Sequence, residues 1–175
     1  MDGDSIGKII LMAVLLVFSA FFSASETAFS TFNRIRMKNL MQSGNKRAKL
    51  VMKYEDRYDK FINSVLIGNN IVNIALSSIA TIFFVDLLRD YAEDAQSLGA
   101  TVSTIVITVT VLLFGEITPK IIAKSHADKV AMAFVMIIHL VIVILTPLSL
   151  VFTGWTKLIM KLFKQHMINM ILKLI

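Results

Sequence analysis

Four long stretches without a charged side chain constrain this chain more than any other feature. They cover residues 9–25, 61–85, 95–115 and 130–156. A bilayer core of about 30 Å is crossed by about 20 helical residues, so each stretch is a candidate membrane span. The composition agrees, because 56% of the 175 residues are apolar and only 17% are charged, where soluble domains have about 25% charged residues. The sequence therefore predicts an all-α membrane protein.

The same features exclude several other classes. The apolar content excludes a disordered chain, and the lack of cysteine excludes a disulfide-stapled domain. The first stretch could be read as an export signal, but it follows Met-Asp-Gly-Asp, where a signal carries positive charge. No nucleophile and base pair, phosphate loop or HExxH motif is present, so we do not expect an enzyme. The net charge of +6 follows the membrane topology, so we expect no nucleic-acid partner.

Lysine and arginine counts in the connecting segments predict the orientation. Residues 33–60 hold nine basic and three acidic side chains, which is typical of a cytoplasmic loop. The connection 86–94 holds one arginine and four acids, so it should lie outside. Lys120, Lys124 and Lys129 return the chain to the cytoplasm. We therefore expect a multi-pass protein of the cell membrane with its N-terminus outside and its C-terminus in the cytoplasm.

The fourth stretch conflicts with this orientation. A fourth crossing would place the lysines after residue 156 outside, whereas Pro147 can break the stretch into two halves. Four spans remain an alternative. We favour three spans, at about 6–29, 61–88 and 97–118, followed by a re-entrant or juxtamembrane helical hairpin at 130–153 on the cytoplasmic side. Residues 154–175 then form an amphipathic helix, with polar side chains every four residues: Lys157, Lys161, Gln165, Asn169 and Lys173.

Polar residues at membrane depth are the best functional clues in such a chain. The first group is Ser19, Ser23, Ser25 and Glu26, at the end of the first span. Ser19 and Ser23 share a helix face, and Glu26 extends that face by a carboxylate. These serines could instead be small residues that only let helices approach each other.

The second group is Gly68, Asn69, Asn70 and Asn73 in the second span, with Ser77 one turn further. Asn69 and Asn73 lie four residues apart, and Asn70, Asn73 and Ser77 follow the spacing of three and four residues. Lipid exposure of three asparagines is costly, so they should face protein, water or an ion. They could also serve only as hydrogen-bonding residues between helices.

The third group is Gly115, Glu116, Pro119 and Lys120, at the cytoplasmic end of the third span. Pro119 has no N–H and clashes with the carbonyl of Gly115, so a backbone oxygen is released beside Glu116. A freed carbonyl in an interrupted helix is typical of membrane cation sites. Alternatively, the helix simply ends at the interface, with Glu116 reaching water and Lys120 extending toward it.

Together the three groups supply only oxygen ligands. Hydroxyl, amide, carbonyl and carboxylate oxygens suit hard cations, whereas zinc and copper favour cysteine and histidine. His126 and His139 are isolated and are expected to pack or to lie at the interface. A sparse, mostly neutral set fits Mg²⁺, which keeps several waters, better than Ca²⁺. The candidate metal-site residues are Ser19, Ser23, Ser25, Gly68, Asn69, Asn70, Asn73, Gly115 and Glu116.

Three motifs in this order resemble a known family. They are Ser-Ala-Ser-Glu-Thr-Ala at 23–28, Gly68-Asn69-x-x-Val72-Asn73, and Gly-Glu-Ile-Thr-Pro-Lys at 115–120. They look like the transmembrane domain of the CorC/CNNM (cyclin M) magnesium transporters. This resemblance implies a homodimer in the lipid membrane with three spans, a juxtamembrane helical belt and Mg²⁺ in an inward-facing pocket. It implies Na⁺-coupled export for some members, and it points to Ser23, Ser25, Asn69, Asn73 and Glu116 as the ligands.

The chain departs from this family after residue 153. Family members continue into cytosolic CBS modules that bind ATP, and residues 154–175 have neither the length nor the pattern for one. We therefore expect a CorC/CNNM-like domain at 1–153 without CBS modules, and ATP binding only through modules absent from this chain. The leading function is magnesium transport. The alternative is a membrane regulator or scaffold that binds a cation or a partner without moving ions.

Overall fold

The computed structural model describes residues 3–89, 91 and 94–172, and every regular element among them is helical. Side chains of α7 after Leu148 are described only at Met160. Eight elements follow in chain order: α1 (Gly3–Thr31), α2 (Arg34–Gln42), α3 (Lys46–Glu55), α4 (Tyr58–Leu88), α5 (Ala95–Thr110), the π-helix η1 (Val111–Ile117), α6 (Thr118–Ser125) and α7 (Ala127–Leu172). The predicted all-α class is confirmed over the described residues.

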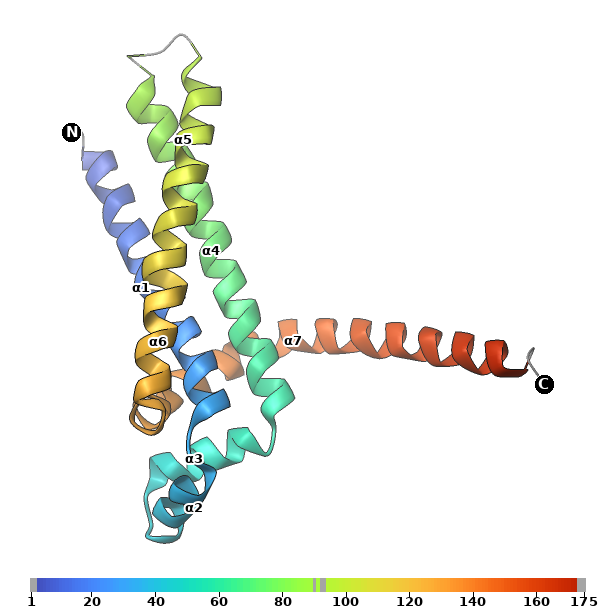
Figure 1. Cartoon of the computed structure of the whole chain (residues 1–175). Helices are drawn as coiled ribbons and strands as arrows, with labels where there is room; N and C mark the ends of the chain where they lie inside the picture. The colour runs from blue at the N-terminus through green and yellow to red at the C-terminus, as the bar shows by residue number, and fades with distance from the viewer. Residues whose placement is uncertain (1–2, 90, 92–93, 173–175) are drawn as a thin grey trace.

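The long helices form a bundle with an apolar outer surface. Figure 1 shows α1, α4 and the continuous α5–η1–α6 rod side by side, with α2 and α3 at one end and α7 running across that end. Outward side chains such as Ile10, Val17, Ile74 and Ile105 are exposed. Four helices are long and apolar enough to cross a membrane: Asp4–Thr31, Tyr58–Leu88, Ala95–Ser125 and Ala127–Leu148. Exposing such a surface to water costs free energy, whereas contact with lipid does not.

Helices α1 and α4 run antiparallel (Figure 1). Near the N-terminus, Lys8 Nζ lies 2.7 Å from a carboxylate oxygen of Asp4 and 2.6 Å from one of Asp86. The start of α1 is thereby tied to the end of α4.

The largest buried apolar cluster lies at the α2–α3 end of the bundle. Phe29 of α1 stacks on Phe61 of α4 with ring centroids 4.1 Å apart, and Phe61 is fully buried. The first part of α7 adds a buried stripe at helical spacing, formed by Ala127, Ala131, Val135, Ile138 and Ile142. This stripe packs α7 across the bundle.

Tyr54 of α3 joins this cluster to α7. Its hydroxyl forms a hydrogen bond with Nδ1 of His139, so His139 is a packing residue, in agreement with its isolation in the sequence. Burial raises the pKa of Tyr54, and the positive charge of Arg57 partly opposes that rise. The phenol is therefore neutral and available for this hydrogen bond at physiological pH.

Asparagine caps and one glycine shape the corner between α1 and α4. Asn33 Oδ1 accepts from Arg36 N at the start of α2, and Asn45 Oδ1 accepts from the backbone of Arg47 and Ala48 at the start of α3. Gly44 has φ of +91°, a conformation that side chains disfavour. These residues turn the chain sharply, so α2 and α3 stay at the bundle end.

The predicted hairpin at 130–153 is wrong, because α7 continues as one α-helix through Pro147 to Leu172. A turn inside this apolar run would leave the backbone groups of two helix ends without partners, whereas a proline inside a continuous helix removes only one N–H. Thr146 Oγ1 donates to the carbonyl of Ile142 one turn earlier. The amphipathic segment predicted at 154–175 is continuous with α7 up to Leu172. The side chains of its predicted polar stripe at 157–169 are not described, and residues 173–175 lie outside the described residues.

We expect Phe61→Ala to destabilise the fold by about 3–5 kcal/mol, because it removes a fully buried ring stacked on Phe29. Chemical unfolding in detergent, followed by circular dichroism, measures this change. Phe18→Ala is the matched control, because Phe18 is 45% exposed on α1. Equal losses in the two variants would contradict the assigned core.

Candidate functional site

Ser19 lies where three helices meet. It is fully buried on α1, and its hydroxyl donates a long hydrogen bond of 3.3 Å to Oδ1 of Asn69 on α4. A Cβ placed on Gly115 of η1 would lie 2.9 Å from the Ser19 oxygen. One residue from each of the three predicted polar groups therefore meets at a single point.

Two further polar atoms are buried without a partner. Among the described residues, the Ser23 hydroxyl and the Asn73 Oδ1 are the buried side-chain oxygen or nitrogen atoms that form no hydrogen bond. Leaving a buried polar group unpaired costs about 1–3 kcal/mol. Such atoms are retained where they serve a ligand or where water reaches them. We call Ser19, Ser23, Asn69, Asn73 and Gly115 the buried polar cluster.

The cluster is elongated along the bundle. Because α1 and α4 are antiparallel, Ser23 lies one turn beyond Ser19 toward the α2–α3 end, and Asn73 lies one turn beyond Asn69 toward the opposite end. One helical turn of four residues rises about 6 Å. The two unpartnered oxygens therefore flank the contact between Ser19 and Asn69, where the sequence suggested one compact pocket.

The third helical segment at the cluster, after α1 and α4, is a π-helix. Residues Val111–Ile117 adopt this wider winding, and the N–H of Thr118 bonds to the carbonyl of Leu113, five residues earlier. Single-turn π segments occur frequently at functional sites. The sequence argument assumed a register of four residues, in which Pro119 frees the carbonyl of Gly115. In the register of five residues, the carbonyl that would bond to an N–H at position 119 belongs to Phe114. The predicted carbonyl therefore shifts by one residue, from Gly115 to Phe114.

Two acidic residues lie close in sequence to members of the cluster, and they differ in their partners. Glu26 of α1 forms an ion pair with Lys120 of α6, with 3.3 Å between oxygen and nitrogen. Glu116, directly after Gly115, is half-buried, and no described side chain forms a hydrogen bond or an ion pair with it. Glu116 is therefore the acid beside the cluster whose charge is not compensated within the described chain.

Three predicted site residues lie elsewhere. Ser25 donates to the carbonyl of Phe21 in its own helix, at 2.6 Å, so its hydroxyl is already paired. Gly68 packs against the ring of Phe22, where an added Cβ would approach a ring atom to 2.6 Å. Asn70 is exposed and lines a separate cavity between α4 and Leu148 of α7. Ser77 is exposed as well.

Sequence reasoning missed two polar contacts. It did not pair Glu26 with Lys120, although both occur in motifs at the same predicted membrane side. It also missed Thr81, whose hydroxyl lies 3.3 Å from that of Ser103 and joins α4 to α5 further along the bundle. Isolated threonine and serine in apolar helices carry no pattern that identifies their partners.

The cluster's chemistry suits a hard cation or water. Its ligand atoms are hydroxyl, amide and backbone carbonyl oxygens, and Glu116 follows Gly115 directly in the chain. Among the described residues, no group of three or more His, Cys, Asp or Glu side chains gathers to hold a metal. The neutral oxygens of the cluster fit an ion that keeps part of its water shell.

Apolar helices of membrane-spanning length, with polar side chains gathered between three of them, define a multi-pass integral membrane protein with an internal polar site. The family described as the cyclin M transmembrane N-terminal domain, CNNM, matches residues 10–170. The chain therefore belongs to the CNNM family, as the three sequence motifs indicated.

Two bacterial relatives show the same membership. A "UPF0053 protein" of Haemophilus influenzae is 35% identical over 153 residues, which is 87% of this chain and 35% of that protein. The "UPF0053 inner membrane protein YfjD" of Escherichia coli is 36% identical over 144 residues, which is 82% of this chain and 32% of that protein. The chain thus spans about a third of the length of these relatives.

We expect Gly115→Ala to destabilise the protein by about 1–2 kcal/mol, because the added methyl group displaces the Ser19 hydroxyl from Asn69. Ser19→Ala in the same chain should recover part of this loss, since it removes the clashing oxygen. Gly7→Ala is the control, because nothing lies within 4 Å of its added Cβ. Thermal unfolding in detergent compares the two single variants, the double variant and Gly7→Ala with the wild type. Strictly additive effects of Ser19→Ala and Gly115→Ala would show that the two residues do not touch.

Proposed function

We propose that this domain moves magnesium ions across the membrane through the buried polar cluster. The observation that carries the proposal is the pair of buried, unpartnered oxygens of Ser23 and Asn73, on either side of the contact between Ser19 and Asn69. Membership of the CNNM family supports an ion-handling membrane domain. Neutral oxygens that are not hydrogen-bonded to each other can coordinate a passing ion.

Magnesium is the cation that this ligand set favours. Mg²⁺ dehydrates reluctantly and is held through one or two carboxylates with several retained waters. Glu116 supplies one such carboxylate beside Gly115, while Lys120 already neutralises Glu26. Selectivity over Ca²⁺ then rests on the small number of acidic ligands, because Ca²⁺ prefers six to eight oxygens.

The proposed topology has three spans. In Figure 1, α7 lies across the end of the bundle that carries α2 and α3, which suits a juxtamembrane helix better than a fourth crossing. The nine basic residues at 33–60 favour the cytoplasm for this end, and therefore an outside N-terminus and a cytoplasmic C-terminus. The family resemblance adds a homodimer as the working assembly.

Export driven by sodium entry is the proposed direction. Two Na⁺ balance one Mg²⁺ in charge, and hard oxygen ligands without sulfur serve either ion. The second candidate is a regulator or scaffold that keeps the cation site without moving ions. Glu26 and Lys120 give that candidate some support, because their ion pair links α1 to α6 and restrains the mouth of the cluster. Binding and flux measurements separate the two functions.

Mg²⁺ should raise the unfolding midpoint of the wild-type protein, because a ligand at ten times its Kd adds about 1.4 kcal/mol of stability. Ser23→Ala and Asn73→Ala should lose this shift without lowering the stability measured in the absence of Mg²⁺, since neither oxygen has a partner to lose. Asn70→Ala is the matched control on the same helix and should keep the shift. A shift that survives in both cluster variants would refute binding at the cluster.

Reconstituted vesicles loaded with a magnesium-sensitive dye should show flux that depends on the cluster. We expect Glu116→Gln and Asn73→Ala to reduce the rate at least about tenfold, the effect of losing about 1.4 kcal/mol at the barrier. Asn70→Ala should retain it, and an opposing Na⁺ gradient should accelerate it. Light scattering checks that each variant keeps the wild-type oligomeric state. Mg²⁺ binding without wild-type flux would favour the regulator, and unchanged flux in both variants would make the site assignment wrong.

A further inference from the structure

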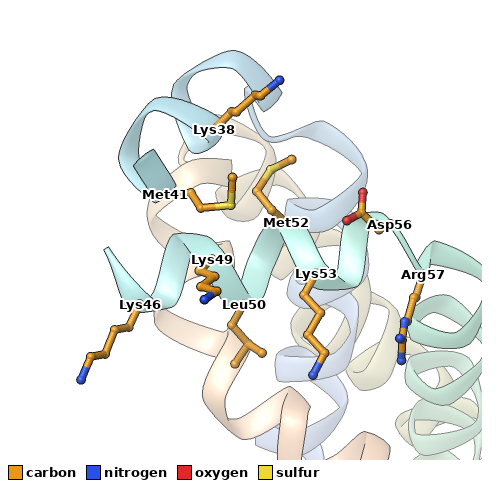
Figure 2. A pocket seen from close by; sticks show the side chains of 9 residues that line it. All are labelled: Lys38, Met41, Lys46, Lys49, Leu50, Met52, Lys53, Asp56 and Arg57. Carbon is orange, nitrogen blue, oxygen red and sulfur yellow. The ribbon is translucent and has the colours of Figure 1, made fainter. Parts of the chain in front are cut away.

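The helical corner formed by α2 and α3 holds a basic pocket that the proposed transport does not use. Its volume is about 760 Å³. Five cationic side chains line it, together with one acid, Asp56 (Figure 2). The cations are Lys38, Lys46, Lys49, Lys53 and Arg57. We call this cavity the basic pocket.

The charges of the basic pocket are not compensated within the described chain. All five cations are exposed, and none of them forms an ion pair with a described residue. The neighbouring Arg34 and Arg36 differ, because they pair with Glu55 and Asp128. Five positive charges against one negative charge leave an excess of four on the pocket wall. Such a concentration of like charge favours an anionic ligand.

Four of the cations form one stripe. Lys46, Lys49, Lys53 and Arg57 follow spacings of three, four and four residues, which places them on one side of α3 and of the turn after it. Figure 2 shows the side chains of Lys53 and Arg57 leaving the backbone on the side along which α4 continues. Cations that served only to keep the surface soluble would have no reason to point toward α4.

The pocket also adjoins the membrane-spanning part of the chain. Arg57 immediately precedes α4, and the candidate span begins at Tyr58. Leu50 projects beside Lys49 and Lys53 in the same direction, and Met41 and Met52 supply further apolar wall. Cations mixed with apolar side chains at the end of a span match the boundary between lipid headgroups and acyl chains.

We propose that the basic pocket binds the phosphate headgroup of an anionic phospholipid. The lysines and Arg57 contact the phosphate, and the apolar wall contacts the glycerol and the start of the acyl chains. A free phosphate in solution would need the charges but not the apolar wall or the direction toward α4. The inference rests on the pocket alone and holds whether or not the domain transports magnesium.

The test uses the purified full chain in neutral detergent, titrated with phosphatidylglycerol and with phosphatidylcholine, and native mass spectrometry counts the bound lipids. We expect the wild-type protein to prefer phosphatidylglycerol by at least about tenfold. Each basic residue at an anionic lipid surface contributes about fivefold. The variant K49Q/K53Q/R57Q should therefore bind phosphatidylglycerol about tenfold to a hundredfold more weakly and should bind phosphatidylcholine as before.

A second triple variant supplies the control. R47Q/K124Q/K129Q removes the same number and types of charge from exposed positions outside the pocket, and its binding should match the wild type within about twofold. Equal losses in both triple variants, or displacement of the lipid by millimolar glycerol phosphate, would overturn the proposal. Circular dichroism checks the fold. If the pocket variant does not fold, K53Q alone should still weaken binding about fivefold, and an unchanged affinity would refute the site.

Discussion

Close approach between helices is the constraint on which this molecule depends. At Gly68 the ring of Phe22 occupies the space that a side chain would fill, and at Gly115 the Ser19 hydroxyl does so. In lipid, helices gain little from burying apolar surface against each other, so van der Waals contact and hydrogen bonds must hold them together. Because Gly68 and Gly115 have no side chains, α1 can pack closely against both α4 and η1. The polar residues can then meet inside the bundle and avoid the bilayer.

The sequence predicted the apolar helices well and singled out the polar residues within them, because both are local properties. Charge-free length identifies a span, and polar residues stand out against apolar neighbours. It could not decide which asparagines face inward. Asn69 and Asn70 differ by about 100° around the helix axis, and the rotation of α4 is set by the fit of Phe22 against Gly68, which involves another helix. The positions of Ser23 and Asn73 on opposite sides of the central contact depend in the same way on antiparallel packing.

Two prolines show where local rules stop. At Pro119 the sequence assigned the freed carbonyl to Gly115 from a register of four residues, whereas the preceding segment is the π-helix η1. At Pro147 the helix continues, where the sequence suggested a turn. In each case the proline fixes which N–H is missing. The response depends on the surroundings, here on Ser19 facing Gly115 and on the stripe that packs the first part of α7 against the core.

The unbroken course of α7 also has a mechanical consequence. Among the described side chains its buried stripe ends at Ile142, and Pro147 follows soon after, so the missing backbone N–H falls just beyond the part of α7 that packs against the core. Helices bend most easily where a proline leaves a backbone hydrogen bond unformed. A bend of α7 at Pro147 would therefore redirect the helix after it and leave its packed first part in place.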